Sequence, residues 1–258
     1  MRQLYVILLF IVTFCTGCQW QKGSSDDAGH AADFAIERYD RVESLYLLEA
    51  DFAALQQMKT EYPVETRMLI EDVLQIGAVD EPDINTRFLM FFQDSTLQTL
   101  LADVERQFAS MDDIDRQLGE AFSRLQTLLP DVEVPRVYTQ IGSLDQSVTV
   151  GDGMLGVSLD KYLGADHPLY QRYGYSETQR SMMTREYIVP DCLAFYLLSL
   201  YPQPVDTTEA SRFRHMGRIQ HVVNQVMQRR FFTNEYVRQA ETDLSSYKGK
   251  ELDSLLRE

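Results

Sequence analysis

The chain has 258 residues, and its 39 acidic and 24 basic side chains give a net charge of −15. This charge excludes nucleic acid as the main partner, because binding to phosphates requires a basic face. Three cysteines are too few for a disulfide scaffold, and a hydrophobic content of 45% excludes a chain that is disordered throughout. The length fits one large domain or two small ones.

The N-terminus has the pattern of a lipoprotein export signal. Arg2 precedes an apolar run of 11 residues, Leu4 to Phe14, which is too short to span a membrane and is typical of a signal-peptide core. The run ends in Cys15-Thr16-Gly17-Cys18. We therefore predict a signal peptide over residues 1–17 and lipidation of Cys18; the alternative is a plain signal peptide with an incidental cysteine.

The remainder divides into a tether and a folded part. Residues 18–32 are small and polar, which predicts a flexible tether, and residues 33–258 are predicted to form a single globular α+β domain. Acidic residues soon after the lipidated cysteine favour export to the cell surface, but here Asp26 and Asp27 lie eight and nine residues after Cys18 and follow Lys22. This order favours the periplasmic face of the outer membrane, with the cell surface as the alternative.

The first half of the domain is predicted to be helical after one short strand. The strand is expected over residues 33–41, short helices over 49–59 and 64–76, and a turn over 80–85. Apolar residues at helical spacing predict two longer helices over 95–110 and 112–129. Asp94 or Ser95 can cap the first, and Pro130 ends the second.

The next segment changes to a β pattern. Residues 134–141 and 147–150 are predicted to pair as a hairpin, followed by a third strand over 154–159. A short helical or looped piece over 160–164 and a tyrosine-rich loop over 165–183 are expected to follow. Together with the helices, these strands predict a mostly helical α+β fold with a small β-hairpin or sheet.

Three helical patterns close the chain. Residues 189–201 are apolar on every side, which predicts a buried central helix with Cys192 as a small buried hydrophobe; a catalytic Cys192 is the alternative. The helix over 207–230 carries a basic strip, which we interpret as a solvated face paired with carboxylates; a binding interface at Arg212, Arg214 and Arg218 is the alternative. The strip comprises Arg212, Arg214, Arg218, Arg229 and Arg230. A polar terminal helix is expected over 234–256.

No catalytic or cofactor motif is present in the sequence. There is no phosphate-binding glycine loop, no G-x-S-x-G, no C-x-x-C and no H-E-x-x-H. A three-histidine metal site would need His167, His215 and His221 together. The candidate pocket or motif residues are Asp152, Asp160, Lys161, Tyr162, His167, Tyr187 and Asp191. We predict no metal, no cofactor and no catalytic residue.

Three segments resemble the gliding-motility lipoprotein family GldB of the Bacteroidota. They are Pro135 to Thr139, Gly151 to Gly164 (GDGMLGVSLDKYLG) and Met183 to Asp191 (MTREYIVPD). The resemblance implies a membrane-anchored component of gliding or of type IX secretion, with other envelope proteins as partners and no established enzymatic activity. Family members continue into a segment with a Gly- and Trp-containing motif that this chain lacks, so no role of that segment is carried over.

A more distant resemblance is to zincin-like metallopeptidases. In these, strands and a glycine turn precede a buried helix that carries H-E-x-x-H. The matching position, Val189 to Leu193, holds neither a zinc ligand pair nor a general-base glutamate. The resemblance implies a degenerate zincin-like core whose groove binds an extended peptide by strand addition.

Two functional hypotheses follow from these observations. The first is a non-enzymatic interaction or assembly factor of the cell envelope, anchored through Cys18. The second is a peptidase-like hydrolase with an unusual site built from Asp160, His167, Asp191 and His215. Convergence of these four side chains in one pocket would favour the second hypothesis.

Overall fold

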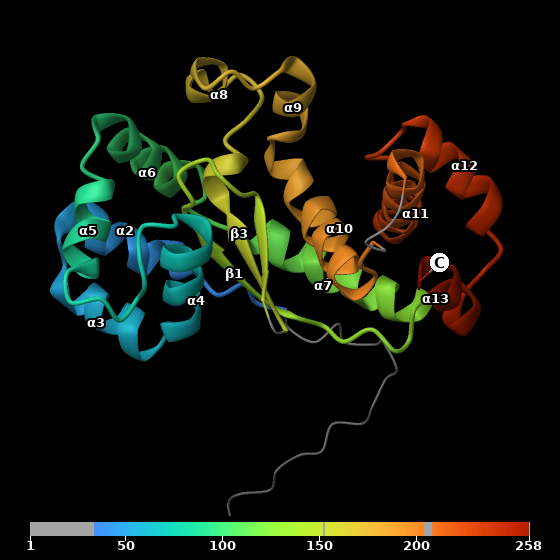
Figure 1. Ribbon diagram of the computed structural model, residues 1–258, viewed down its shortest axis with the longest axis horizontal. Helices are drawn as coiled ribbons and strands as arrows, with labels where there is room; N and C mark the ends of the chain where they lie inside the picture. Colours follow the sequence, from blue (N-terminus) through green and yellow to red (C-terminus); the bar gives the residue numbers. More distant parts are fainter. Residues whose placement is uncertain (1–33, 152, 204–207, 258) are drawn as a thin grey trace, which may run out of the picture. The chain divides into compact units, whose positions relative to one another are not determined.

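The computed structural model describes residues 34–151, 153–203 and 208–257. The predicted signal peptide, the tether with Cys18, and Asp152 lie outside the described residues. The described residues belong to one compact unit. Figure 1 shows its helices arranged around a small sheet.

The first elements are helices rather than a strand. They are α2 (Tyr39–Glu49), α3 (Phe52–Thr60), α4 (Pro63–Arg67), the π-helical turn η2 (Met68–Val73) and α5 (Ile84–Phe91). The strand predicted over residues 33–41 is wrong: only Glu37 pairs with a strand, through one parallel bridge to Tyr138. The polar residues Asp40 and Glu43 are buried in α2, and they hide its helical pattern from a hydrophobicity analysis.

The two longer helices match their prediction. Helix α6 (Ser95–Gln107) begins after Asp94, whose carboxylate accepts the Thr96 N–H at 2.8 Å, and α7 (Asp112–Leu128) follows. The inward residues of both stripes are buried: Leu100, Leu101, Val104, Ile114, Leu118, Phe122 and Leu125. These stripes are core, as their spacing indicates.

The sheet has three strands in the order β1-β3-β2. Strand β1 (Arg136–Gln140) runs parallel to β3 (Met154–Ser158), and β2 (Val148–Gly151) runs antiparallel to β3. The predicted hairpin of the first two strands is therefore wrong, because β3 lies between them. The tight turn joins β2 to β3 instead, where Gly153 adopts a φ of +70°.

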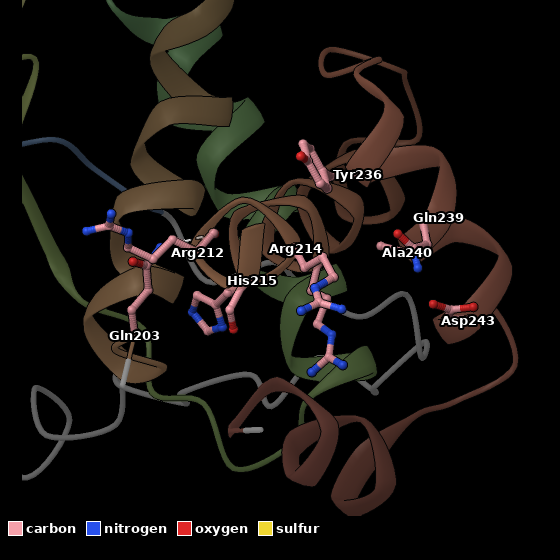
Figure 2. Close-up of a pocket in the computed structure, with 10 residues that line it drawn as sticks. Gln203, Arg212, Arg214, His215, Tyr236, Gln239, Ala240 and Asp243 are labelled. Atoms are coloured by element: carbon pink, nitrogen blue, oxygen red, sulfur yellow. Dashed lines mark hydrogen bonds between the residues drawn. The ribbon is translucent and has the colours of Figure 1, made fainter. Parts of the chain in front are cut away.

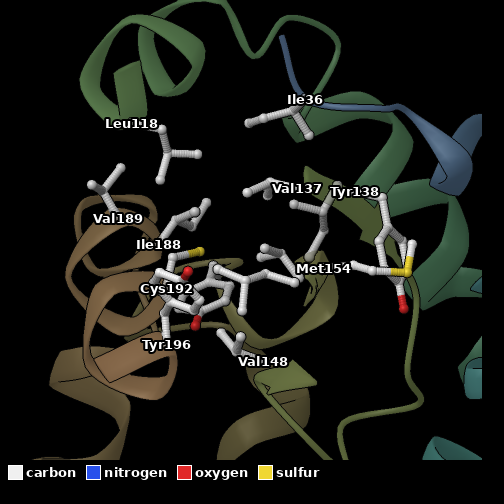
Figure 3. Packing of buried hydrophobic residues seen from close by; sticks show 14 of the residues in the cluster. Ile36, Leu118, Val137, Tyr138, Val148, Met154, Ile188, Val189, Cys192 and Tyr196 are labelled. Carbon is white, nitrogen blue, oxygen red and sulfur yellow. The ribbon is translucent and has the colours of Figure 1, made fainter. Parts of the chain in front are cut away.

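Helix α10 (Ile188–Leu200) is largely buried, as predicted for residues 189–201, and it contacts β2, β3, α7 and α11. In Figure 3, its residues Ile188, Cys192 and Tyr196 lie across from Val137 and Val148 of the sheet. Cys192 is fully buried, which confirms its expected role as a small hydrophobe. Figure 1 shows α10 running alongside the strands, with α7 next to it.

The remaining elements in the described second half of the chain are two 3₁₀ turns and five helices. They are η3 (Leu159–Lys161), α8 (Pro168–Arg172), α9 (Glu177–Met182), η4 (Arg185–Tyr187), α11 (Glu209–Met227), α12 (Glu235–Leu244) and α13 (Gly249–Arg257). Two short helices thus occupy the predicted loop over 165–183. The predicted terminal helix over 234–256 is two helices, since the chain turns before Gly249, whose φ is +57°. No helix among the described residues is long and apolar enough to cross a membrane.

Candidate functional site

Three consecutive motif residues, Asp160, Lys161 and Tyr162, connect the sheet to its surroundings. They follow β3 in the 3₁₀ turn η3 and at its end. A 3₁₀ helix has three residues per turn, so its successive side chains point about 120° apart around the helix axis. Each of the three therefore reaches a different part of the chain.

Asp160 holds the connection between β1 and β2. Its carboxylate is fully buried and accepts the N–H of Gly142 at 2.8 Å and of Leu144 at 2.5 Å. Ser143 and Leu144 have left-handed φ values of 52° and 67°, which cost free energy in residues other than glycine. Burial raises the pKa of Asp160, while the two N–H donors oppose that rise. The side chain thus stabilises a strained loop.

Glu43 of α2 supports the same connection from the other side. Its carboxylate is fully buried and accepts the N–H of Ile141 at 2.9 Å. Burial, together with the nearby Asp160 and Asp40, raises the pKa of Glu43 well above its ordinary value. Sequence analysis missed this residue because a glutamate within a short helix resembles a surface residue.

Lys161 reaches the outer side of the same loop. Its ammonium donates to the Leu144 carbonyl at 3.2 Å and to the Tyr175 hydroxyl at 2.9 Å, and it lies 4.5 Å from the centre of the Tyr175 ring. The Tyr175 hydroxyl donates to the Leu144 carbonyl as well, at 2.7 Å. Lys161 and Tyr175 therefore bind the outer side of the β1–β2 connection, whose inner side is bound by Asp160.

Tyr162 and Asp191 join η3 to the first turn of α10. The buried Tyr162 hydroxyl donates to the Asp191 carboxylate at 2.8 Å. Burial raises the pKa of Asp191 to about 7, against the opposing influence of the Tyr162 hydroxyl and the Lys161 charge. Burial and the same carboxylate raise the pKa of Tyr162.

A small cavity of about 160 Å³ opens beside this pair. Lys161, Tyr162 and Asp191 line it, together with Ser147, Tyr175, Gln179, Met182 and Met183. The structure therefore brings three of the candidate residues to one place. Ser147, Tyr175 and the α9 residues lacked any signal in the sequence, because their approach depends on how the 165–183 segment folds back.

The other candidate residues lie elsewhere. His167 contacts Asp103 of α6, with a distance of 3.1 Å from its Nε2 to the carboxylate oxygen, and the Tyr187 hydroxyl donates to the Phe231 carbonyl at 3.4 Å. His215 donates to the Tyr201 carbonyl at 2.8 Å. Of the four residues in the hydrolase hypothesis, only Asp191 opens onto the cavity.

His167, His215 and His221, the histidines in the described part of the chain, do not assemble into a metal site. Within residues 34–151, 153–203 and 208–257, no three His, Cys, Asp or Glu side chains are placed to hold a metal ion. His221 is buried in α11, and burial lowers its pKa. It lines a cavity different from the one beside His215.

The basic strip of α11 divides into two parts. Arg229 pairs with Glu186 at 2.8 Å and Arg230 with Glu241 at 2.5 Å, so these two follow the predicted pairing with carboxylates. Arg212, Arg214 and Arg218 instead line a pocket between α11 and α12.

Comparison with protein families gives one match. The family described as "Gliding motility protein GldB" matches residues 21–236, which is most of the chain. The chain belongs to this GldB family. The match contains the D-K-Y turn, the cavity beside Asp191 and all of α11. Comparisons with curated proteins and with solved structures gave no match.

Membership identifies this GldB-family chain as a lipoprotein associated with gliding motility. Each of the three side chains of the D-K-Y motif, which is part of the family resemblance, forms a hydrogen bond within the fold. Asp160 and Lys161 hold the β1–β2 connection, and Tyr162 holds α10. The motif thus fixes the position of the edge strand β2 relative to α10.

Proposed function

We propose that this GldB-family chain is a non-enzymatic assembly factor that binds an extended segment of another envelope protein along β2. The family supports the setting, because it is a gliding-motility lipoprotein family. The observation that carries the proposal is the outer edge of β2, which pairs with no other described strand and lies between two cavities.

The backbone of β2 offers hydrogen-bonding groups away from β3. The Ser158 N–H donates to the Ser147 carbonyl at 3.0 Å, and the two strands are antiparallel. Bonded and non-bonded pairs alternate in such a ladder, so the N–H and C=O groups of Val148 and Val150 point outward. Among the described strands, β2 lies at the edge of the sheet. An extended peptide can add to this edge.

Cavities at both ends of β2 can receive side chains of the added peptide. The cavity of about 160 Å³ lies beside Ser147 and Asp191. A second cavity, of about 580 Å³, is lined by Val150 and Gly151 and by Tyr196 and Leu200 of α10. An antiparallel edge strand beside the buried helix is the arrangement that the zincin-like resemblance implies for a peptide-binding groove.

A hydrolytic role has less support. The Tyr162 hydroxyl is bonded to Asp191 itself, and the Lys161 ammonium is bonded to the Leu144 carbonyl and the Tyr175 hydroxyl. The histidines of the hydrolase hypothesis have partners elsewhere. A carboxylate alone provides neither an activated nucleophile nor an acid–base pair. The position that matches the metal-binding helix of zincins holds Asp191, and α10 contains neither a histidine nor a second acidic residue.

The same proposal includes the anchor and its location. Lipidated Cys18 would hold the chain in the outer membrane, facing the periplasm, near the gliding and secretion machinery. Replacement of Cys18 by serine is then expected to release the chain from membranes, as followed by fractionation. Retention of the C18S chain in the membrane fraction would contradict lipid anchoring.

The edge of β2 is tested by a proline substitution. Val150→Pro removes an outward N–H without removing a hydrogen bond of the β2–β3 ladder, so the fold is retained while an added strand is blocked. Val150→Ala is the matched control. In cells that lack the chromosomal copy, we expect Val150→Ala to restore surface spreading and protein secretion and Val150→Pro to fail. Full restoration by Val150→Pro, at equal protein level and melting temperature, would refute the proposal.

A further inference from the structure

A polar pocket of about 350 Å³ lies between α11 and α12. Arg212, Arg214, His215 and Arg218 line it from α11, and Tyr236 and Asp243 line it from α12. Figure 2 shows Arg214 between His215 and the α12 side, with Asp243 at the end away from Arg212. Three arginine side chains thus line one cavity, in a chain of net charge −15, and Figure 2 shows Arg212 and Arg214 on opposite sides of His215.

The pocket is built by a close approach of the two helices. Gly217 lies so near Tyr236 that an added Cβ would be 2.6 Å from the Tyr236 Cβ. The rings of Phe213 and Tyr236 stack with 5.5 Å between their centroids. A glycine at this crossing therefore fixes α12 against α11, and the neighbouring arginines line the space that remains.

The arginines of the pocket differ from those at the end of α11. Within the described ranges, Arg212 and Arg214 form no ion pair, whereas Arg229 and Arg230 each have a carboxylate partner. Arg218 is held in place by its bond to the Leu255 carbonyl at 2.6 Å. Positive charges that line one cavity repel each other, and a bound anion would offset that repulsion.

His215 lies buried at the same pocket, where one of its ring nitrogens is bonded to the backbone. Its Nε2 lies 2.8 Å from the Tyr201 carbonyl, which can only accept, so Nε2 carries the proton. The imidazole is 7% exposed, and its orientation is fixed by this bond. The pocket therefore has buried and anchored members, as well as the exposed Arg214.

We propose that this pocket binds a phosphate group, carried either by a lipid headgroup or by a soluble phosphate ester. Planar guanidinium groups match the oxygens of phosphate in pairs, and several of them spread the charge of a dianion. The volume suits a headgroup-sized molecule rather than a long acidic peptide. Asp243 provides an acceptor for an amine or hydroxyl group of the ester.

Calorimetric titration of the full chain, purified in detergent, tests this site at constant ionic strength. The probes are inorganic phosphate, glycerol phosphate and glycerophosphoethanolamine. We expect saturable binding to the wild-type chain and at least about tenfold weaker binding to Arg214→Gln, because one charge-assisted hydrogen bond is worth about that factor. Arg229→Gln, at the other end of α11, is the matched control and should bind as the wild type does. Arg212→Gln provides a second exposed position.

The probes distinguish the source of the phosphate. Tighter binding of glycerophosphoethanolamine than of inorganic phosphate supports a lipid headgroup, and equal binding supports a soluble phosphate. The absence of saturable binding by all three probes would overturn the proposal. Two further results would also overturn it, provided that the melting temperatures of the chains agree. The first is equal affinity of the wild type and Arg214→Gln for the phosphate probes. The second is that the wild type binds succinate, a dianion without phosphate, as tightly as it binds these probes.

Discussion

The Asp191→Asn substitution tests the electrostatics of the cavity beside α10. The carboxylate accepts the Tyr162 hydroxyl at 2.8 Å, and burial raises its pKa from an ordinary value of 3.8 to about 7. Between these two values the folded chain holds a proton that the unfolded chain releases. The free energy of unfolding therefore falls as the pH rises from about 4 to about 7, and this contribution levels off above that range.

The magnitude follows from the same two values. One pKa unit corresponds to about 1.4 kcal/mol, so a rise from 3.8 to about 7 sets an upper limit of about 4 kcal/mol. Solvent in the cavity screens the charge, and we expect about 1–3 kcal/mol. Asparagine has nearly the same shape, can still accept the Tyr162 hydroxyl and carries no charge at any pH. The variant should therefore gain stability relative to the wild type by this amount.

Urea unfolding of both chains at pH 5, 6, 7 and 8 measures the effect. The difference between them, variant minus wild type, is expected to increase from pH 5 to pH 7 and then to remain constant, which separates Asp191 from all other titrating groups. Tyr162→Phe is the companion variant. It removes the hydroxyl that lowers the pKa of Asp191, so the pKa of Asp191 should rise further. The free energy of unfolding of this variant should therefore continue to fall at a pH above 7. A difference that does not vary with pH would refute the reasoning.

Three further predictions concern the structure around the sites. Asp160→Ala leaves the Gly142 and Leu144 N–H groups without partners and should lower the free energy of unfolding by about 3–5 kcal/mol in urea, and Asp160→Asn by less; equal losses would contradict the clamp on the loop. Gly217→Ala should destabilise the chain by about 1–3 kcal/mol in thermal unfolding, since its Cβ would be 2.6 Å from the Tyr236 Cβ; a neutral effect would contradict the close crossing of α11 and α12. Burial raises the pKa of the Cys192 thiol, so iodoacetamide should modify Cys192 only when urea unfolds the chain, as located by mass spectrometry; rapid modification of the native chain would contradict its burial.

Hydrophobic spacing was sufficient to predict the long helices and the buried central helix. The residues of α7 that repeat at helical spacing are buried, and α10 is apolar on every side and lies in the core. In contrast, α2 was missed because Asp40 and Glu43 face inward. Both have buried partners far along the chain: the Thr139 hydroxyl donates to Asp40, and the Ile141 N–H donates to Glu43. A pattern of local hydrophobicity contains no information on such distant partners.

The strand pairing and the site depended on the same kind of distant contact. Three consecutive β segments favour sequential pairing, but β3 entered between β1 and β2, and Asp160 secured the long connection that this order requires. The family motif identified Lys161, Tyr162 and Asp191, which do meet at one cavity. It did not indicate Ser147 or Tyr175, because their approach depends on how the 165–183 segment folds back toward Lys161 and the β1–β2 connection.

The most direct test of a non-enzymatic role is the activity of Asp191→Asn in cells. Asp191 is the only acidic residue that lines the cavity of about 160 Å³ within the described part of the chain, so hydrolytic chemistry that uses an acidic group at this place would require its carboxylate. A strain that carries Asp191→Asn as its only copy should spread on surfaces and secrete protein as the wild type does, at equal protein level. Loss of both functions, with a melting temperature at or above that of the wild type, would contradict the account and support catalysis at this cavity.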